Sequence, residues 1–201
     1  MKLISVAILR YMRDTAEPVM LSQAADLSSI GFFQRNGVKE LLTFFARMLV
    51  KRTSPGMRQT VQHNEFDYNV HVYVRADGLA GAVTSDMEYP PRVAFVMLTQ
   101  LLDQFALDVR GWETEIRSEA IQWPPLGEAL IRYQDPAEAD KVTKIQRDLD
   151  QTTEILHKTI DNVLERGEKL DSLVERSDDL SRQSKLFYSQ ARKANSCCLI
   201  L

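Results

Sequence analysis

The residues with the clearest chemistry lie at the end of the chain, where two adjacent cysteines, Cys197 and Cys198, precede Leu-Ile-Leu. The last four residues fit the C-a-a-X pattern of a cysteine, two aliphatic residues and a terminal residue. A prenyltransferase binds the aliphatic pair and terminal residue while zinc activates the thiolate. We therefore expect a prenyl group on Cys198, and a terminal Leu favours geranylgeranyl over farnesyl. The competing interpretation is a frayed hydrophobic end with two incidental cysteines.

A single lipid would hold this chain only weakly on a membrane. One lipid chain gives marginal, reversible binding, at about 0.8 kcal/mol per buried methylene, so stable anchoring takes a second signal. The nearby basic residues Lys185, Arg192 and Lys193 form a thin patch. Cys197 is the natural second attachment point, for a palmitoyl or a second prenyl group. Because adjacent cysteines cannot staple a fold, we expect the chain on the cytosolic side.

The remaining composition argues against catalysis and against nucleic acid. The three histidines, His63, His71 and His157, are scattered, with no Cys or His at metal-ligand spacing beside them. Phosphate-binding and nucleophile-elbow motifs are missing, so no metal, no cofactor and no enzymatic activity are expected. A net charge of -3 and a pI near 5.7 predict no nucleic-acid partner. No apolar run approaches the roughly eighteen residues of a membrane span.

A heptad pattern runs from Val142 to Ala194 and must position the lipidation signal. Apolar residues recur in alternating steps of three and four, which is the signature of a coiled-coil helix with one narrow buried stripe. We call this stripe the seam. Its apolar layers are Val142, Ile145, Leu149, Leu156, Val163, Leu170, Leu173, Leu180 and Phe187. Since only the seam can be buried, the helix needs partners.

A single arginine, Arg166, occupies the middle of the seam. A charge in a buried layer is costly unless each donor is paired. In one interpretation Arg166 is a discontinuity in the coil, or a register device in a homodimer. In the other, partner helices supply oxygen atoms at the same level that accept hydrogen bonds from its guanidinium group. Spacing alone does not choose between them.

The stretch before the seam predicts a compact α+β domain over residues 1–135. Residues 2–9 are almost wholly apolar, as expected of a central strand covered on both faces. Further strands are predicted near residues 19–25, 58–63, 66–75 and 79–84, and helices near 38–52, 92–109 and 126–133. Five strands joined mainly by hairpins favour an antiparallel sheet with helices on both faces.

Several motifs of this sequence resemble the longin SNAREs. The segment LERGEKL, Leu164 to Leu170, resembles the central layer of an R-SNARE motif, in which one arginine meets a glutamine from each of three partner helices. The first domain is similar to a longin domain, which has a profilin-like fold. The matching stretches are FFQR (32–35), HVYVR (71–75), EYP and RVAF (88–90 and 92–95) and RYQDP (132–136). The ending resembles that of the lipid-anchored longin R-SNARE without a transmembrane helix. That family often ends in Met, so Leu201 leaves open which prenyl group Cys198 carries.

The resemblance implies an organisation and a set of partners. It divides the chain into a longin domain (1–135), an R-SNARE coiled-coil motif (137–195) and a lipidation tail (196–201). The partners would be three Q-SNARE helices, the SNARE disassembly machinery, a protein prenyltransferase and, through the lipid anchor, a membrane. The chain would cycle between the cytosol and the cytosolic face of Golgi, endosomal, vacuolar and ER-derived membranes.

The resemblance further implies that the longin domain folds back on the SNARE motif and shelters the lipid. The helix face around Phe44 and Phe45 is the candidate docking surface, and ordinary core packing is the competing interpretation of these two residues. For the whole chain, two alternatives to a fusion SNARE remain. One is a lipid-anchored coiled-coil tether or trafficking adaptor, and the other is a small-molecule-binding domain with an appended helix.

Overall fold

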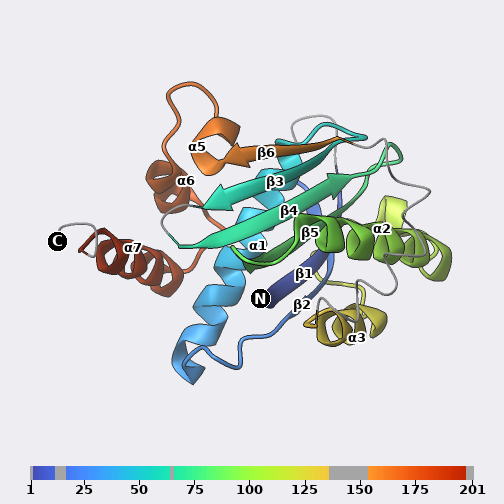
Figure 1. Ribbon diagram of the computed structural model, residues 1–201, viewed down its shortest axis with the longest axis horizontal. Coiled ribbons are helices and arrows are strands. Elements are labelled where there is room, and N and C mark those ends of the chain that lie inside the picture. Colours follow the sequence, from blue (N-terminus) through green and yellow to red (C-terminus); the bar gives the residue numbers. More distant parts are fainter. Residues whose placement is uncertain (1, 12–16, 64–65, 136–153, 198–201) are drawn as a thin grey trace.

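The computed structural model describes residues 2–11, 17–63, 66–135 and 154–197 (Figure 1). The first part of the chain forms five strands and three helices, with two short 3₁₀ helices, η1 (Phe32–Gln34) and η2 (Trp112–Thr114). The strands are β1 (Leu3–Arg10), β2 (Val19–Ala25), β3 (Arg58–His63), β4 (Tyr68–Val74) and β5 (Leu79–Asp86). The helices are α1 (Arg35–Lys51), α2 (Pro91–Asp108) and α3 (Pro125–Arg132).

These strands form a sheet with the order β2-β1-β5-β4-β3 and antiparallel pairing throughout. The first strand pairs with β2 on one side and β5 on the other, so it lies inside the sheet. Helices cover both faces, which is why the two sides of β1 are both apolar and why Leu3 to Leu9 is mostly buried. The expected α+β fold, with helices on both faces of the sheet, is confirmed.

The two faces of the sheet have separate hydrophobic cores. On one face, α2 and α3 pack against β1 and β5, with Phe105 and Leu98 fully buried. On the other face lies α1, whose apolar stripe includes Leu41, Leu42 and Leu49. Figure 1 shows α2 and α3 on the opposite side of the sheet from α1. The face that carries α1 is the one that concerns function.

The described C-terminal residues differ from the single long helix that the heptads predict. They form a sixth strand, β6 (Ile155–Thr159), and three helices, α5 (Ile160–Val163), α6 (Leu170–Arg176) and α7 (Arg182–Cys197). We call residues 154–197 the C-terminal segment. Strand β6 pairs in parallel with β3, so the sheet has six strands rather than five. The physical reason is that β3 is otherwise an edge strand with unpaired backbone groups, which an extended segment can satisfy.

Candidate functional site: the face that carries the C-terminal segment

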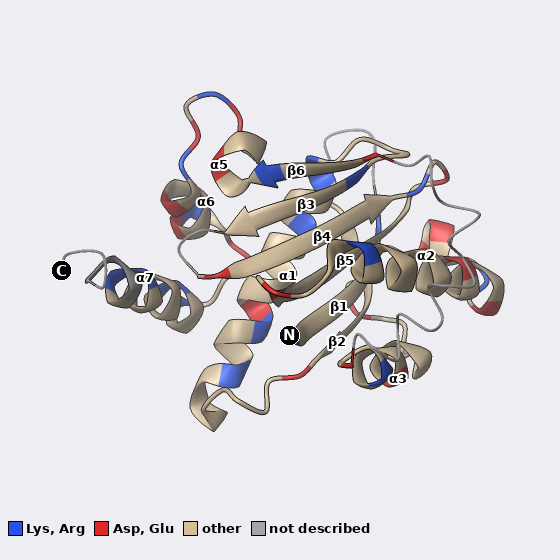
Figure 2. Ribbon diagram, viewed as in Figure 1, with Lys and Arg blue, Asp and Glu red and all other residues tan. Residues whose placement is uncertain are grey.

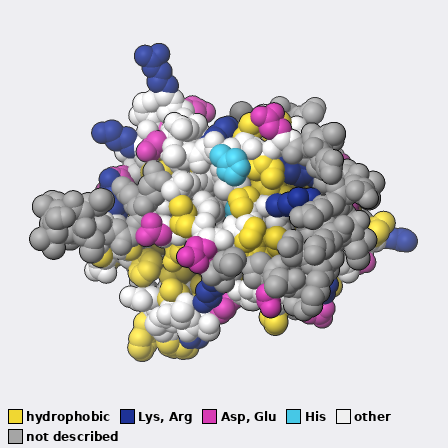
Figure 3. All heavy atoms as spheres, in the orientation of Figure 1, with side chains coloured by type: hydrophobic (Ala, Val, Ile, Leu, Met, Phe, Trp, Pro, Cys, Tyr) yellow, Lys and Arg dark blue, Asp and Glu magenta, His cyan; other side chains and the backbone are white. Residues whose placement is uncertain are grey.

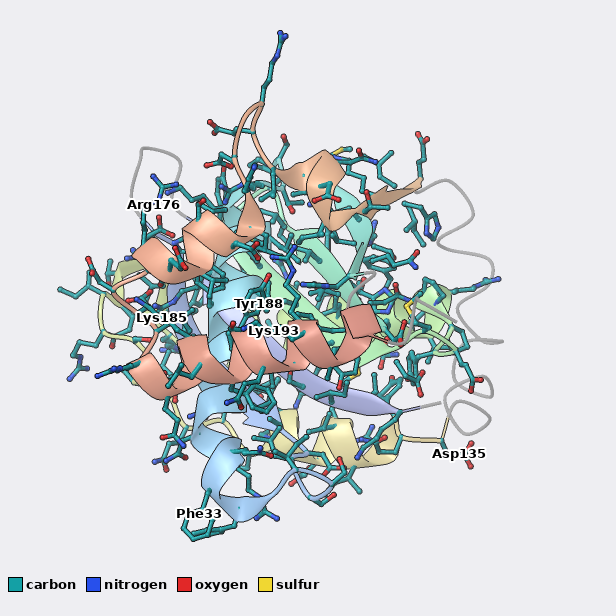
Figure 4. All side chains as sticks on the ribbon, turned by 90° about the vertical axis from the view of Figure 1, so that its left-hand side faces the viewer. Phe33, Asp135, Arg176, Lys185, Tyr188 and Lys193 are labelled. Carbon is teal, nitrogen blue, oxygen red and sulfur yellow. The ribbon has the colours of Figure 1, made fainter. Side chains whose placement is uncertain are left out.

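The C-terminal segment lies along the α1 face of the domain from β6 to α7. Strand β6 runs beside β3, with Arg58 opposite Ile155 and Gln62 opposite Thr159. A protruding loop joins α5 to α6, and α7 then lies across α1 (Figures 1 and 4). The chain thus holds its own heptad segment against its N-terminal domain.

Apolar burial is the main force that holds the segment in place. Its buried side chains belong to the same hydrophobic cluster as Leu41 and Leu49 of α1 and Val61 of β3. They are Ile160, Val163, Leu170, Val174, Leu180 and Tyr188. Fully burying a large apolar side chain stabilises by about 1.5–3 kcal/mol, so these six side chains outweigh the polar contacts described below.

Glu40 of α1 fixes the beginning of α7. One carboxylate oxygen, Oε2, accepts hydrogen bonds from the Ser181 backbone N–H at 2.8 Å and from the Ser184 hydroxyl at 2.5 Å. Burial raises the pKa of Glu40, but the bonds from Ser184 and Ser181 outweigh it, and the net pKa lies below the ordinary value. A carboxylate beside the first turn also complements the helix dipole of α7.

Two ion pairs join α1 to the rest of the segment. Arg47 Nη1 lies 2.7 Å from Asp179 Oδ2, just before α7, and Arg52 Nη2 lies 2.9 Å from Glu168 Oε2 in the α5–α6 loop. The arginine side chains are largely buried, whereas Asp179 is more than half exposed. Exposed pairs contribute about 0–1 kcal/mol, so the Arg47–Asp179 pair sets register more than it adds stability.

An apolar groove of about 460 Å³ lies between α1, the end of β3 and α7. Phe45, His63, Phe66 and Tyr188 line it in a chain of ring contacts with centroid distances of 5.4, 4.5 and 5.4 Å. Burial lowers the pKa of His63 to about 4, so its imidazole is neutral near pH 7. Ala191 and Ala194 near the end of α7 also line the groove, so it opens beside the last turns before the cysteines.

The predicted docking residues lie at this face. Phe44 is half-buried and lines a cavity of about 610 Å³ together with Leu173 and Ser177 of the C-terminal segment. Phe45 is half-buried and lines the apolar groove with Phe187. The two rings touch edge to face at a centroid distance of 5.5 Å. Their position at the contact is a structural fact, and their role in regulation stays a prediction.

The apolar layers of the seam fall into three groups. Val163, Leu170 and Leu180 are buried against the domain, whereas Leu156, Leu173 and Phe187 are half-buried. The layers Val142, Ile145 and Leu149 lie outside the described residues, as does Cys198. Cys197 ends α7.

Arg166 does not lie in a buried layer here. It is exposed in the loop between α5 and α6, in a turn with Gly167. In this arrangement its guanidinium group faces solvent, while Val163 and Leu170 on either side are buried. The role of Arg166 as a central layer is therefore a prediction about a different state of the segment.

Sequence reasoning missed several residues of this face. Ile160, Val174 and Tyr188 are buried, yet none belongs to the seam. Each directly follows a seam position, at Thr159, Leu173 and Phe187 respectively, so an apolar residue beside the seam was the available signal. No local sequence pattern predicts that Glu40 caps α7, because its partners lie about 140 residues away in the sequence.

Helix α7 is basic, and apolar side chains are exposed near its beginning. Helix α7 carries four basic residues and neither Asp nor Glu (Figure 2). Hydrophobic side chains gather at the lower left of Figure 3, and Phe33 projects from the lower end of the molecule in Figure 4. Phe32 and Phe33 are 77% and 85% exposed. The backbone carbonyl of Phe33 accepts a hydrogen bond from Gln183 at 2.9 Å, which links this turn to α7.

Comparisons with known proteins match both parts of the chain. A model of the regulated-SNARE-like, or longin, domain matches residues 27–127, and a synaptobrevin model matches residues 141–200. The chain is 50% identical over 202 residues to the VAMP-like protein YKT61 of Arabidopsis thaliana, with all of both chains covered. It is 47% identical over 200 residues to the synaptobrevin homolog ykt6 of Schizosaccharomyces pombe, again over the full length of both.

The synaptobrevin homolog YKT6 of Saccharomyces cerevisiae is 44% identical over 184 residues, which are 90% of this chain and 91% of the relative. Together with the fold, these matches define a longin-domain R-SNARE, a class of vesicle-trafficking proteins. Among the described residues, no helix is both long enough and apolar enough to cross a membrane. The chain belongs to the YKT6 family of synaptobrevin homologues.

Proposed function

We propose that residues 137–195 assemble with three Q-SNARE helices into a parallel four-helix bundle, and that the described arrangement is the closed form. The observation that carries this proposal is that the closed form buries the same seam residues that a four-helix bundle would bury. Val163, Leu170 and Leu180 are buried against the longin domain, yet they also occupy the heptad positions that a bundle would bury. The same side chains cannot be buried in both places, so the longin domain competes with the partner helices.

Assembly would convert the C-terminal segment into a continuous helix. A helix from Val142 to Ala194 would be about 75–80 Å long at ~1.5 Å per residue. Zippering toward the lipidated end would draw two membranes together, and the SNARE disassembly machinery would return the chain to the free state. Such a protein acts by assembly rather than by catalysis.

The lipid anchor would link the closed form to the membrane. Cys198 would carry the prenyl group and Cys197 a palmitoyl or second prenyl group. The apolar groove lies beside Ala191 and Ala194, only a few residues before these cysteines, and is a candidate shelter for a lipid chain. Opening would release both the lipid and the seam, so membrane attachment and assembly would be coupled on Golgi, endosomal, vacuolar and ER-derived membranes.

The proposed central layer is tested by exchanging its charge. Arg166→Gln would place four glutamines in one layer with three Q-SNARE partners, and we expect slower assembly and a lower melting temperature of the complex. Replacing one partner glutamine by arginine restores the original composition and should rescue both. Assembly is measured as formation of a 1:1:1:1, detergent-resistant complex.

Two outcomes contradict this proposal. A partner glutamine-to-arginine exchange that rescues nothing would show that Arg166 does not meet those glutamines. Homodimers in place of the four-chain complex would favour a lipid-anchored tether. The matched control is Arg176→Gln, which removes an exposed basic residue outside the seam and should leave assembly unchanged.

A further inference from the structure

The chain reverses at the centre of the SNARE motif through a tight turn. Residues 165–168 form it, with the Glu168 backbone N–H donating to the Glu165 carbonyl at 2.9 Å. Gly167, the third residue, has a φ of +90°. A turn with a positive φ at its third residue favours glycine, because a residue that has a side chain is strained in the left-handed region.

A contact with Arg52, the residue that directly follows α1, holds this turn in place. The Glu168 carboxylate accepts a hydrogen bond from the Glu165 backbone N–H at 3.0 Å and from Arg52 Nη2 at 2.9 Å. The bond from Glu165 and the neighbouring Arg52 lower the pKa of Glu168 below its ordinary value. The turn is therefore closed on itself by Glu165 and tied to the longin domain by Arg52.

Glycine is poorly suited to the helix that the seam predicts for the same residues. In a helix interior glycine is among the least favourable residues, and only proline is worse. A Cβ at position 167 would meet nothing within 4 Å in this structure, so no neighbour demands a small residue. The positive φ of the turn is therefore the one structural feature that favours glycine at position 167. The continuous helix that the seam predicts does not favour it.

We propose that Gly167 is the torsional switch of the segment. At positive φ it turns the chain between α5 and α6 in the closed form, and at helical φ it joins the two halves into one helix around Arg166. The second half of this inference rests on the proposed bundle, whereas the first half concerns the closed form alone.

Gly167→Ala in the full chain tests the switch. Alanine at positive φ should lower the ratio of closed to open form about 5- to 30-fold. Hydrogen exchange of the β6 and α6 amides should accelerate by that factor, while exchange of β1 and β5 stays unchanged. Gly167→Asn should have a smaller effect, because asparagine tolerates the left-handed region.

Alanine should also favour the helix about fivefold over glycine, so assembly of Gly167→Ala with three Q-SNARE helices should be faster.

Gly111→Ala is the matched control. Gly111 has a φ of +79° and also has nothing within 4 Å of its Cβ position, but it lies between α2 and η2, away from the segment. Its substitution should not selectively expose β6 and α6. The switch is overturned if Gly167→Ala leaves their exchange unchanged, accelerates β1 and β5 equally, or has no larger effect than Gly167→Asn.

The assembly measurement separates this inference from the proposed function. If exchange accelerates but Gly167→Ala assembles no faster than the unsubstituted chain, Gly167 is not a helix position in the complex and the second half is wrong. If the unsubstituted chain forms no four-chain complex at all, the proposed bundle fails. The exchange result would then still decide whether Gly167 holds the turn.

Discussion

The side chain of Phe44 lies between its own domain and the C-terminal segment. Its ring touches Phe45 on α1 and lines a cavity with Leu173 and Ser177. A charged side chain at position 44 would therefore replace the apolar ring that faces the segment, while the core of the domain keeps its fully buried side chains.

We predict that Phe44→Glu opens the closed form without unfolding the longin domain. Losing the half-buried ring should cost the closed form about 1–2 kcal/mol, which lowers the ratio of closed to open form roughly 5- to 30-fold. With the lipid released, a larger fraction of the prenylated chain should sediment with membranes. Fractionation of cells into cytosol and membranes measures this change, and thermal unfolding checks the domain.

Phe33→Glu supplies the control for that substitution. Phe33 is 85% exposed, and only its backbone carbonyl contacts α7 in a hydrogen bond. The same change of ring to carboxylate there should leave the closed form populated. An unchanged cytosol-to-membrane ratio for Phe44→Glu would show that this ring does not hold the closed form.

Individual residues of this face differ in how far the sequence predicts them. The resemblance to the longin SNAREs points to the helix face around Phe44 and Phe45, and the position of Phe44 off the main apolar stripe of its helix singles it out within that face. The location of Arg166 in a solvent-exposed turn could not be predicted, because the heptads describe a helix with partners and not the segment without them. Glu40 and Ser184 meet only through the tertiary fold, which no local pattern records.

At the scale of elements, α1 and α7 approach each other closely at a glycine. A Cβ built on Gly37 would lie 3.4 Å from Ser184 Oγ and 3.6 Å from Ser184 Cα. Ser184 is fully buried at this contact. A single methyl group at position 37 would make ordinary contact with Ser184, so any larger side chain would push α7 away from α1.

We predict that Gly37→Val separates α7 from α1. Overpacking of a close contact typically costs about 1–3 kcal/mol, so the α7 amides should exchange roughly tenfold faster. Gly127→Val is the control. It is also the third residue of its helix, so the cost of a β-branched residue is matched, but nothing lies within 4 Å of its Cβ position. Equal acceleration of α7 exchange in both variants would contradict the predicted contact.

The elements of the domain follow their sequence patterns closely, whereas β6 does not. The alternating apolar residues of β4 and the stripe of α1 locate both elements within a few residues. Residues 155–159 carry heptad positions at Leu156 and Thr159, and the same five residues also include β-branched side chains suited to a strand. The free edge of β3 decides between these two states, and that edge is supplied by residues about 95 positions earlier.

At the scale of the whole molecule, one set of side chains serves two proposed states. The longin domain buries Val163, Leu170 and Leu180 together with Ile160, Val174 and Tyr188. The proposed bundle would bury only the seam. The closed form is thus a competitor of assembly, and its stability should set how much of the chain is available to partners.

A cross-link between α1 and α7 tests this competition most directly. Gly37→Cys with Ser184→Cys, in a chain with Cys197 and Cys198 replaced by serine, places two thiols where a Cβ on residue 37 would lie 3.6 Å from Ser184 Cα. The added side chain loosens this contact in the reduced chain, whereas a disulfide ties α7 to α1. We predict that the oxidised chain fails to form the four-chain complex with three Q-SNARE helices, and that the same protein assembles after reduction. An oxidised chain that assembles as fast and as completely as the reduced chain would contradict the account.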